Sequence, residues 1–534
     1  MDPTSVLVFY TIDSSKNTFG SSGTLISENW VLAHGSLLEP LALRSDELRS
    51  IAQDLRVGKL TKSPGKKPSI EFLVTCEVKA TETGPPPCCD AKVIPNVSKS
   101  SLSQETCNRS PLTFRTRKAR LAAAWKCPLL VEAFEGILSS WRFCESSRGE
   151  NIAAADNELF PVLLLLRIQN GDAASSNPTT ELQDALRNFL KVLAPPQRGQ
   201  EVEIESTPFG NPVFINSLAT GVVSNVLGPS KSLLLTDANA VIGCEGGPIF
   251  VKHKSGRRAV SGIVIAPLSW CRGEWVGYTL GVSLIPCLHR VLDIPGTNIN
   301  LRLPTFGPGV VKMLDRSVVV VRCGSGWGSG VLVDKATGTF LTCSHVVKEA
   351  PNSRITISNA NFSTRGELVY KTPYEKSYDL AIVRVEPQEV ASLQNVSMAT
   401  TLIQKRDEVV CAGFPLFSSR DQPQILPTVT RGRVSQVSDG MLQTSCCIQS
   451  GTSGGPVAAW PGGELVGIIV CNATSAGNKA LFPRVNMAVP ATIFEEPIRE
   501  YLRTQDVKRL SRLENRNIRI QQAWNLNLAP LAHL

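Results

Sequence analysis

The sequence predicts a mainly β chain that contains two tandem units, each built from a pair of β-barrels, and that ends with a helix. Three observations lead to this fold class. Short apolar runs separated by glycine-rich turns fill the C-terminal half, their landmarks recur in the same order in the N-terminal half, and the pattern turns helical and basic from Glu495. The chain has 534 residues, 42% hydrophobic and 19% charged, enough for two or three domains with complete cores.

Ten strands are expected in the C-terminal half, because the runs are short, apolar or β-branched, and bounded by turn residues. They cover residues 318–323, 330–333, 340–343, 355–357, 380–385, 408–413, 433–437, 455–459, 465–470 and 486–489.

The candidate nucleophile is Ser453, within the hexapeptide GTSGGP at residues 451–456. The flanking glycines allow the backbone to turn so that the N–H groups of Gly451 and Ser453 point at one spot. A tetrahedral intermediate of acyl transfer would place its oxyanion there. We therefore expect Gly451 and Ser453 to form an oxyanion hole.

A serine nucleophile of the chymotrypsin type requires a histidine and then an aspartate upstream. His345 lies in TCSHVV and Asp379 in SYDLAIV, with 379−345 = 34 residues between them. Singly, such a histidine is usually a surface residue and such an aspartate could simply end a turn. Because order, glycine context and flanking strands all agree, we interpret His345 as the general base and Asp379 as the residue that orients it.

Two residues are predicted to shape the pocket for the substrate side chain that precedes the scissile bond. Cys447 lies six residues before Ser453, at the base of this pocket in proteases of this class, and Asn472 ends an apolar strand that lines it. Without an aspartate at the base, selection of lysine or arginine is not expected. A small neutral side chain, cysteine included, fits better.

The N-terminal half repeats these landmarks in order. GCEGGP at residues 243–248 parallels GTSGGP, and His34 lies in a segment that parallels the one around His345, with an imperfect offset. Glu245 holds the nucleophile position, where a carboxylate would repel an oxyanion, and Asp156 is the nearest candidate acid. We expect a degenerate site at His34 and Glu245, because a chance similarity of strand and turn patterns does not explain the shared order. The other parallel segments are 21–26 with 328–333, 163–168 with 381–385, 219–224 with 430–435, and 260–264 with 465–469.

These landmarks divide the chain into a degenerate unit at residues 1–295, a catalytic unit at 305–500 and a helical tail at 501–534. His34 and Glu245 are 245−34 = 211 residues apart, against 453−345 = 108 in the second unit. The difference predicts an insertion at about residues 40–156. It contains an expected helix over 120–141 and an exposed, poorly ordered loop around 80–112. A further helix is expected over 180–192.

Composition argues against several other classes of protein. The net charge of +9 is spread along the chain, so we expect no nucleic-acid partner. Fifteen cysteines follow no disulfide or zinc template, which favours a reducing compartment and no metal or other cofactor. No signal peptide is visible, and the longest apolar stretch, 159–166, is too short to cross a membrane.

The last three residues are Ala532, His533 and Leu534. They resemble the small–basic–leucine tripeptide of the type 1 peroxisomal targeting signal, which an import receptor reads at the free carboxylate. The alternative is an uninformative polar terminus. Together with the thiol-rich chain, the tripeptide favours a peroxisomal address.

The GTSGGP half, the degenerate GCEGGP half and the AHL terminus together resemble one family over most of the chain, the peroxisomal leader peptide-processing proteases of the chymotrypsin clan. The resemblance implies a serine endopeptidase of the peroxisome matrix with tandem chymotrypsin-like double β-barrels. It also implies self-association as a homodimer. It implies removal of leaders from proteins imported with the type 2 signal. It also implies processing of some type 1 proteins, including enzymes of fatty-acid β-oxidation.

The cysteines at 88, 89 and 107 lie in the expected exposed loop, and the pocket favours a small side chain, so we expect self-cleavage within residues 85–112. Two alternatives stay open. An HtrA-like quality-control protease outside the peroxisome shares the catalytic motifs, although no PDZ module follows them here. A non-catalytic scaffold would keep the barrels without the chemistry.

Overall fold

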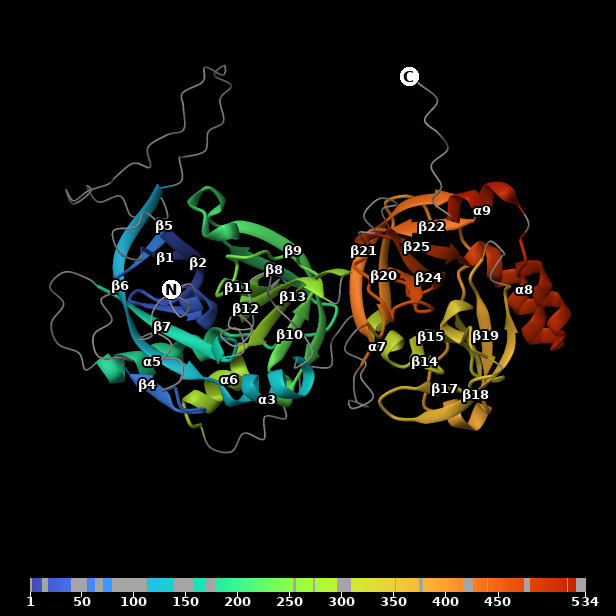
Figure 1. Ribbon diagram of the computed structural model, residues 1–534, viewed down its shortest axis with the longest axis horizontal. Helices are drawn as coiled ribbons and strands as arrows, with labels where there is room; N and C mark the ends of the chain where they lie inside the picture. Colours follow the sequence, from blue (N-terminus) through green and yellow to red (C-terminus); the bar gives the residue numbers. More distant parts are fainter. Residues whose placement is uncertain are drawn as a thin grey trace, which may run out of the picture.

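The computed structural model describes residues 2–11, 18–39, 55–62, 71–78, 113–138, 158–169, 178–252, 256–271, 274–294, 309–350, 352–373, 378–415, 426–438, 440–474, 481–515 and 517–524. Their strands form four barrels, and consecutive barrels pair into an N-terminal unit and a C-terminal unit (Figure 1). This confirms the predicted fold class of two tandem chymotrypsin-like double-barrel units. Among these residues, no helix is long and apolar enough to cross a membrane.

The C-terminal unit begins with helix α7 (Gly309–Asp315) and contains barrels C and D. Barrel C closes in the order β14-β15-β16-β19-β18-β17, and barrel D in the order β20-β21-β22-β25-β24-β23. All ten strands expected from the sequence are present. The strands of barrel C are β14 (Val318–Cys323), β15 (Gly326–Asp334), β16 (Thr339–Thr342), β17 (Ile355–Ser358), β18 (Ser363–Lys371) and β19 (Ala381–Arg384). Those of barrel D are β20 (Glu408–Gly413), β21 (Thr428–Ser438), β22 (Met441–Thr444), β23 (Pro456–Ala459), β24 (Leu465–Thr474) and β25 (Leu481–Pro490).

The N-terminal unit repeats this plan in barrels A and B. Barrel A runs β5-β1-β2-β3-β7-β6 and closes through β5–β6 pairing, with β4 added to β6, and barrel B runs β10-β13-β12-β11-β8-β9. The strands of barrel A are β1 (Thr4–Thr11), β2 (Thr18–Ser27), β3 (Trp30–His34), β5 (Phe72–Val78), β6 (Thr113–Lys126) and β7 (Val162–Ile168), with β4 at Leu60–Lys62. Those of barrel B are β8 (Glu201–Ser206), β9 (Ser217–Leu227), β10 (Leu233–Thr236), β11 (Pro248–Lys252), β12 (Arg258–Cys271) and β13 (Glu274–Ser283).

In the described part of the chain the helices are few and lie outside the barrels. Those of the N-terminal unit are α3 (Pro128–Ala133), continued by a π-helical turn at Phe134–Leu138, α5 (Pro178–Val192) and α6 (Leu284–Val291). The expected helix at 180–192 is thus confirmed as α5. In the C-terminal unit, α8 (Ala491–Thr504) follows the last strand and leads to a 3-10 helix at Val507–Leu513 and to α9 (Ile518–Trp524).

Two expectations for the N-terminal unit need correction. The helix expected over 120–141 is wrong at its start, because β6 extends to Lys126 and the helical residues begin only at Pro128. The stretch interpreted as an insertion, 40–156, supplies β5 and β6, two of the six strands that close barrel A. The loop expected at 80–112 and the self-cleavage range 85–112 lie outside the described residues, as does Asp156.

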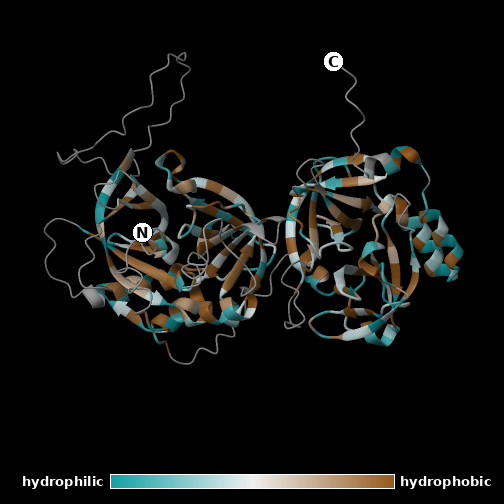
Figure 2. Cartoon of the chain, viewed as in Figure 1, coloured by the Kyte–Doolittle hydropathy of each residue, from teal (hydrophilic) through white to brown (hydrophobic). Residues whose placement is uncertain are grey.

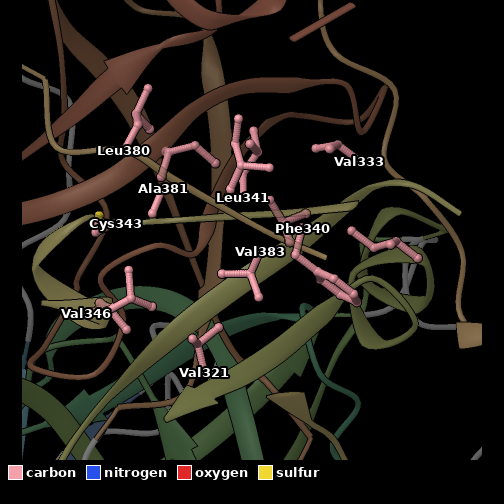
Figure 3. Packing of buried hydrophobic residues seen from close by; sticks show 14 of the residues in the cluster. Val321, Val333, Phe340, Leu341, Cys343, Val346, Leu380, Ala381 and Val383 are labelled. Atoms are coloured by element: carbon pink, nitrogen blue, oxygen red, sulfur yellow. The ribbon is translucent and has the colours of Figure 1, made fainter. Parts of the chain in front are cut away.

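Several core strands, such as β10 and β16, are buried at every position, so that both faces of the strand are packed. In barrel C, Phe340, Leu341 and Val383 are fully buried, and Figure 3 shows these side chains close together on their strands. The same core includes Cys343 and Leu380, which are close in sequence to His345 and Asp379. Tight packing of these neighbours therefore fixes the backbone that carries both polar residues.

Helix α8 contacts β24 and β25, and its apolar face joins the hydrophobic core that these strands share with barrel C. Its Phe494, Ile498 and Tyr501 are buried and belong to the barrel C core, at the i, i+4 and i+7 spacing of one helix face. In Figure 2 most residues of α8 have the hydrophilic colour, whereas the barrel strands carry hydrophobic stretches. Helix α8 is therefore part of the core of the C-terminal unit.

The two units also contact each other directly, through barrels B and D (Figure 1). β9 lies against β21, and Asn225 Nδ2 donates hydrogen bonds to Leu426 O at 3.1 Å and to Thr428 Oγ1 at 3.2 Å. The Arg198 guanidinium pairs with the Asp315 carboxylate at 2.6 Å. The interface thus combines buried hydrogen bonds with a largely buried ion pair.

Removing the aromatic ring in Phe494→Ala should destabilise the C-terminal unit by about 3–5 kcal/mol, because it leaves a cavity in the barrel C core. The exposed Arg503→Ala, on the same helix, is the matched control and should change the free energy of unfolding by less than about 0.5 kcal/mol. Urea unfolding followed by fluorescence measures both. Equal effects of the two substitutions would contradict the assignment of α8 to the core.

Candidate active site

Ser453 lies on the turn between β22 and β23, where Gly451 and Gly454 have φ angles of +95° and +85°. Residues with a side chain rarely adopt these angles. A Cβ atom at position 454 would also lie only 2.2 Å from Ser329 O. The glycines of the hexapeptide are therefore required both by the backbone angles and by close contact with barrel C.

The nucleophile turn docks onto barrel C through one buried serine. Ser329 N–H donates to Ser453 O at 2.8 Å, and Ser329 Oγ donates to Gly451 O at 2.8 Å. The same hydroxyl oxygen accepts from Phe414 N–H of barrel D at 2.9 Å. Ser453 is thus fixed at the junction of the two barrels.

His345 and Asp379 form a hydrogen-bonded pair. The His345 Nδ1–H donates to Asp379 Oδ2, and the backbone N–H of His345 donates to Asp379 Oδ1 at 2.9 Å. The His345 side chain is 40% exposed and that of Asp379 is 26% exposed, so a substrate could reach the imidazole. This pairing orients the ring and assigns Nε2 as the nitrogen able to accept a proton.

The segment that carries His345 lies against the nucleophile turn. A Cβ atom at Gly328 would lie 2.5 Å from Val346 Cγ2 and 2.8 Å from Ser453 O, so both neighbours approach the same point of β15. The Ser453 hydroxyl donates to Val470 O at 2.9 Å. It must therefore turn from this carbonyl before it can donate to the imidazole, as catalytic hydrogen bonds often form only with substrate bound.

Cys343 is a third polar group near this pair. The ligand atoms of Cys343, His345 and Asp379 all lie within 4.8 Å of one another, as metal ligands would. However, Cys343 Sγ donates to Ile469 O at 3.1 Å, and burial raises the pKa of this thiol well above its usual range. His345 Nδ1 and both carboxylate oxygens of Asp379 are already joined by the two hydrogen bonds of the pair, so the arrangement is that of a base and the acid that orients it.

The two predicted pocket residues belong to one region at the unit interface. Cys447 is buried, its thiol donates to Val276 O at 3.4 Å and to Gly277 O at 3.6 Å, and burial raises the pKa of this thiol to about 12. Asn472 Nδ2 donates to Ile448 O at 3.1 Å. Its Oδ1 is buried and has no hydrogen-bond partner among the described residues. The pocket roles of both residues stay predictions.

The N-terminal unit repeats the docking of the nucleophile turn. Ser22 Oγ donates to Gly243 O at 2.8 Å and accepts from Thr207 N–H at 2.8 Å, as Ser329 does with Gly451 and Phe414. Gly246, at φ +86°, approaches Ser22 O as Gly454 approaches Ser329 O. The duplication is therefore present in individual contacts as well as in strand order.

Strand register corrects the role expected for His34. Thr24 pairs with Leu32, and Val331 pairs with Leu341, so Leu32 matches Leu341 and His34 matches Cys343. Counting on from these pairs, Ser36 takes the position of His345. In β7, Leu164 matches Ala381 and Val162 consequently matches Asp379.

His34 instead has a structural environment. Its Nε2–H donates to Phe160 O at 2.9 Å, its Nδ1 lies 2.9 Å from Ser36 Oγ, and burial lowers the pKa of the imidazole to about 4. A neutral, fully buried histidine with both ring nitrogens occupied is not the remnant of a general base. The imperfect offset in the sequence was the signal of this shift.

Glu245 occupies the nucleophile position of the N-terminal unit. Its Oε2 accepts a hydrogen bond from Gly243 N–H at 2.7 Å, and Gly243 corresponds to Gly451. Burial raises the pKa of this carboxyl group to about 7. The Glu245 carboxylate therefore accepts the hydrogen bond that an oxyanion would require from Gly243. This site lacks both a nucleophile and a free oxyanion donor, so it is unsuited to acyl transfer.

Comparison with known proteins agrees with this geometry. Residues 328–468 match the trypsin-like peptidase domain family, a span that contains His345, Asp379 and Ser453. A peroxisomal leader peptide-processing protease of Mus musculus is 28% identical, over 97% of this chain and 94% of that protein. The protein of the same name from Homo sapiens is 30% identical, over 78% of this chain and 76% of that protein.

The chain belongs to the family of peroxisomal leader peptide-processing proteases. The magnetosome formation protease MamE of Magnetospirillum gryphiswaldense is 31% identical over only 31% of this chain and 21% of its own length. The family resemblance seen in the sequence is thus confirmed, and the match to both halves distinguishes this family from proteases that share only the catalytic motifs.

Sequence reasoning missed the residues that support the site. Ser329 was noted only as a landmark of the repeat, although a serine followed directly by glycine in both copies, Ser22-Gly23 and Ser329-Gly330, was a usable signal. Gln449, which is buried beside the turn, carried no motif at all. Its contacts become visible only in the folded chain.

Restoring the hydroxyl alone should not restore a site in the N-terminal unit. In a Ser453→Ala background, Glu245→Ser is expected to leave the protein unlabelled by a fluorophosphonate, because Ser36 and Val162 stand where a base and an acid are needed. Intact-protein mass spectrometry measures the adduct, and the protein with Ser453 intact is the positive control. Labelling of the new serine would refute the register-based assignment.

Proposed function

We propose that this chain is a serine endopeptidase whose active site is Ser453, His345 and Asp379. The observation that carries the proposal is the oriented His345–Asp379 pair beside a glycine-framed serine, inside the span that matches trypsin-like peptidases. In the N-terminal unit the equivalent positions hold Ser36, Val162 and Glu245, so the chemistry is confined to the C-terminal unit.

The proposed reaction uses each group in a distinct role. His345 Nε2 takes the Ser453 hydroxyl proton as the oxygen attacks the scissile carbonyl, and later returns it to the leaving amine. Asp379 fixes the tautomer and stabilises the imidazolium. The N–H groups of Gly451 and Ser453 stabilise the oxyanion, each by about 3 kcal/mol. Water then hydrolyses the acyl-enzyme through the same base.

The proposed substrates are proteins imported into peroxisomes. Both relatives that cover most of the chain are named peroxisomal leader peptide-processing proteases. We assign to this chain the removal of leaders from proteins with the type 2 signal, and the processing of some type 1 proteins including β-oxidation enzymes. The matrix location rests on the terminal tripeptide Ala532-His533-Leu534, which lies outside the described residues and would engage the import receptor.

The pocket proposal retains Cys447 and Asn472. An asparagine Oδ1 that is buried without a partner among the described residues can accept a hydrogen bond from a small polar side chain. Such a pocket favours a small neutral residue before the scissile bond, cysteine included. The same proposal includes self-association as a homodimer. It also includes a degenerate unit at 1–295, a catalytic unit at 305–500 and a tail at 501–534.

The proposal is tested by comparing cells that contain the active protein with cells that contain Ser453→Ala. Proteomics of protein N-termini in isolated peroxisomes should show mature ends of type 2 proteins with the first and retained leaders with the second. The rate of leader removal should fall by more than about a thousandfold in Ser453→Ala, because no other described group replaces the nucleophile. Identical N-termini in both would reject leader processing.

Self-cleavage is tested with the same two purified proteins. The active chain should break within residues 85–112 over time and Ser453→Ala should stay intact. Equal fragmentation of both would indicate a contaminating protease and reject self-cleavage. Deletion of the last three residues should leave the protein outside peroxisomes, whereas unchanged import would remove the tripeptide from the proposal.

A further inference from the structure

The N-terminal unit reaches the active-site region of the C-terminal unit through β13. We define the pocket loop as residues 446–452, which precede Ser453 and include Gly451 of the oxyanion hole. Val276, Gly277 and Tyr278, in the middle of β13, all contact this loop. These contacts lie at the place where the two units meet.

Gln449 makes the most direct of these contacts. It is 3% exposed, and its Nε2 donates to Val276 O at 2.5 Å. Its own backbone is part of the turn, because Thr452 N–H donates to Gln449 O at 2.9 Å and Gln449 N–H donates to Thr452 Oγ1 at 3.3 Å. The anchored residue is thus hydrogen-bonded to the residue between Gly451 and Ser453.

Two further contacts hold the start of the loop. The Tyr278 hydroxyl donates to Cys447 O at 3.3 Å, and the Cys447 thiol packs in the apolar core of the N-terminal unit. Gly277, at φ +69°, allows close approach, since a Cβ there would lie 3.3 Å from Cys447 Sγ. The loop is therefore held by backbone carbonyls and a hydroxyl of β13.

We propose that β13 of the degenerate unit positions the oxyanion hole of the catalytic unit, with Gln449 as the positioning residue and Tyr278 as its support. The inference rests on the proposed protease function. An oxyanion hole works only when its N–H groups already point at the developing charge. A loop released from Val276 and Tyr278 would lose that orientation while Ser453, His345 and Asp379 stay in place.

The consequence is a functional role for the N-terminal unit that needs no catalysis of its own. Barrel B would act in cis as a fixed support for the catalytic loop. Because the interface supplies the support, changes that loosen it at β13 should reduce the rate of the chemical step, whereas loosening it elsewhere should not.

The test compares two buried amides that cross the same interface. Gln449→Met and Asn225→Leu each replace an amide by an apolar side chain of similar size, but Asn225 contacts Leu426 and Thr428 and not the pocket loop. For each variant we would measure the rate of fluorophosphonate labelling of Ser453, kcat and KM on a leader peptide, and the melting temperature. Tyr278→Phe is a milder third variant.

Gln449→Met is expected to slow labelling and kcat by about tenfold to a hundredfold with KM changed less than about twofold. In Tyr278→Phe the labelling rate and kcat should fall by about threefold, since this substitution removes one hydrogen bond. Asn225→Leu should lower the melting temperature by a similar amount yet keep the labelling rate within about twofold. If Gln449→Met does not fold, Tyr278→Phe against Asn225→Leu decides by the same comparison.

Unchanged labelling in Gln449→Met and Tyr278→Phe would overturn the inference while leaving the proposed protease intact. So would equal losses in Asn225→Leu and Gln449→Met, because the effect would then be general destabilisation of the interface. An unsubstituted chain that is neither labelled nor active would overturn the proposed function itself, and this inference with it.

Discussion

The hydrogen bonds of one buried serine hydroxyl hold the nucleophile turn onto its neighbouring barrel, and the rest of the site depends on them. Ser329 connects the turn at Gly451 to barrel C and, through Phe414, to barrel D. Since barrel C carries His345 and Asp379 and barrel D carries Ser453, these contacts bring the two halves of the site together. Ser22 makes the same contacts in the N-terminal unit, so both units join their two barrels in the same way.

The two units show how one scaffold can retain its geometry and lose its reaction. In the N-terminal unit, the turn, its positive φ glycines and its docking serine are all present, yet Glu245 accepts the hydrogen bond that an oxyanion would accept. The N-terminal unit does keep a surface that contacts the C-terminal unit. β13 contacts the pocket loop through main-chain carbonyls, which do not depend on side-chain identity and therefore leave no motif in the sequence.

Much of the fold could be predicted because the buried strands of barrels C and D are apolar and end at glycine or charged turns. β18 was missed because it is half-exposed and charged, and β22 because its sequence, MLQT, has only two apolar residues. In barrel A, long connections separate β5 and β6 from their neighbours, so two barrel strands were interpreted as an insertion. The residues of the proposed active site were readable from local motifs. The hydrogen bond of Gln449 joins it to Val276, 173 positions away, and no local pattern records such a contact.

The central claim is that chemistry resides at Ser453 alone and depends on the oriented imidazole. The most direct measurement is mass-spectrometric mapping of a fluorophosphonate adduct on the intact chain and on His345→Ala. A single modified residue, Ser453, with the adduct lost in His345→Ala, is the result predicted here. An adduct on another residue, or equal labelling without the imidazole, would contradict it.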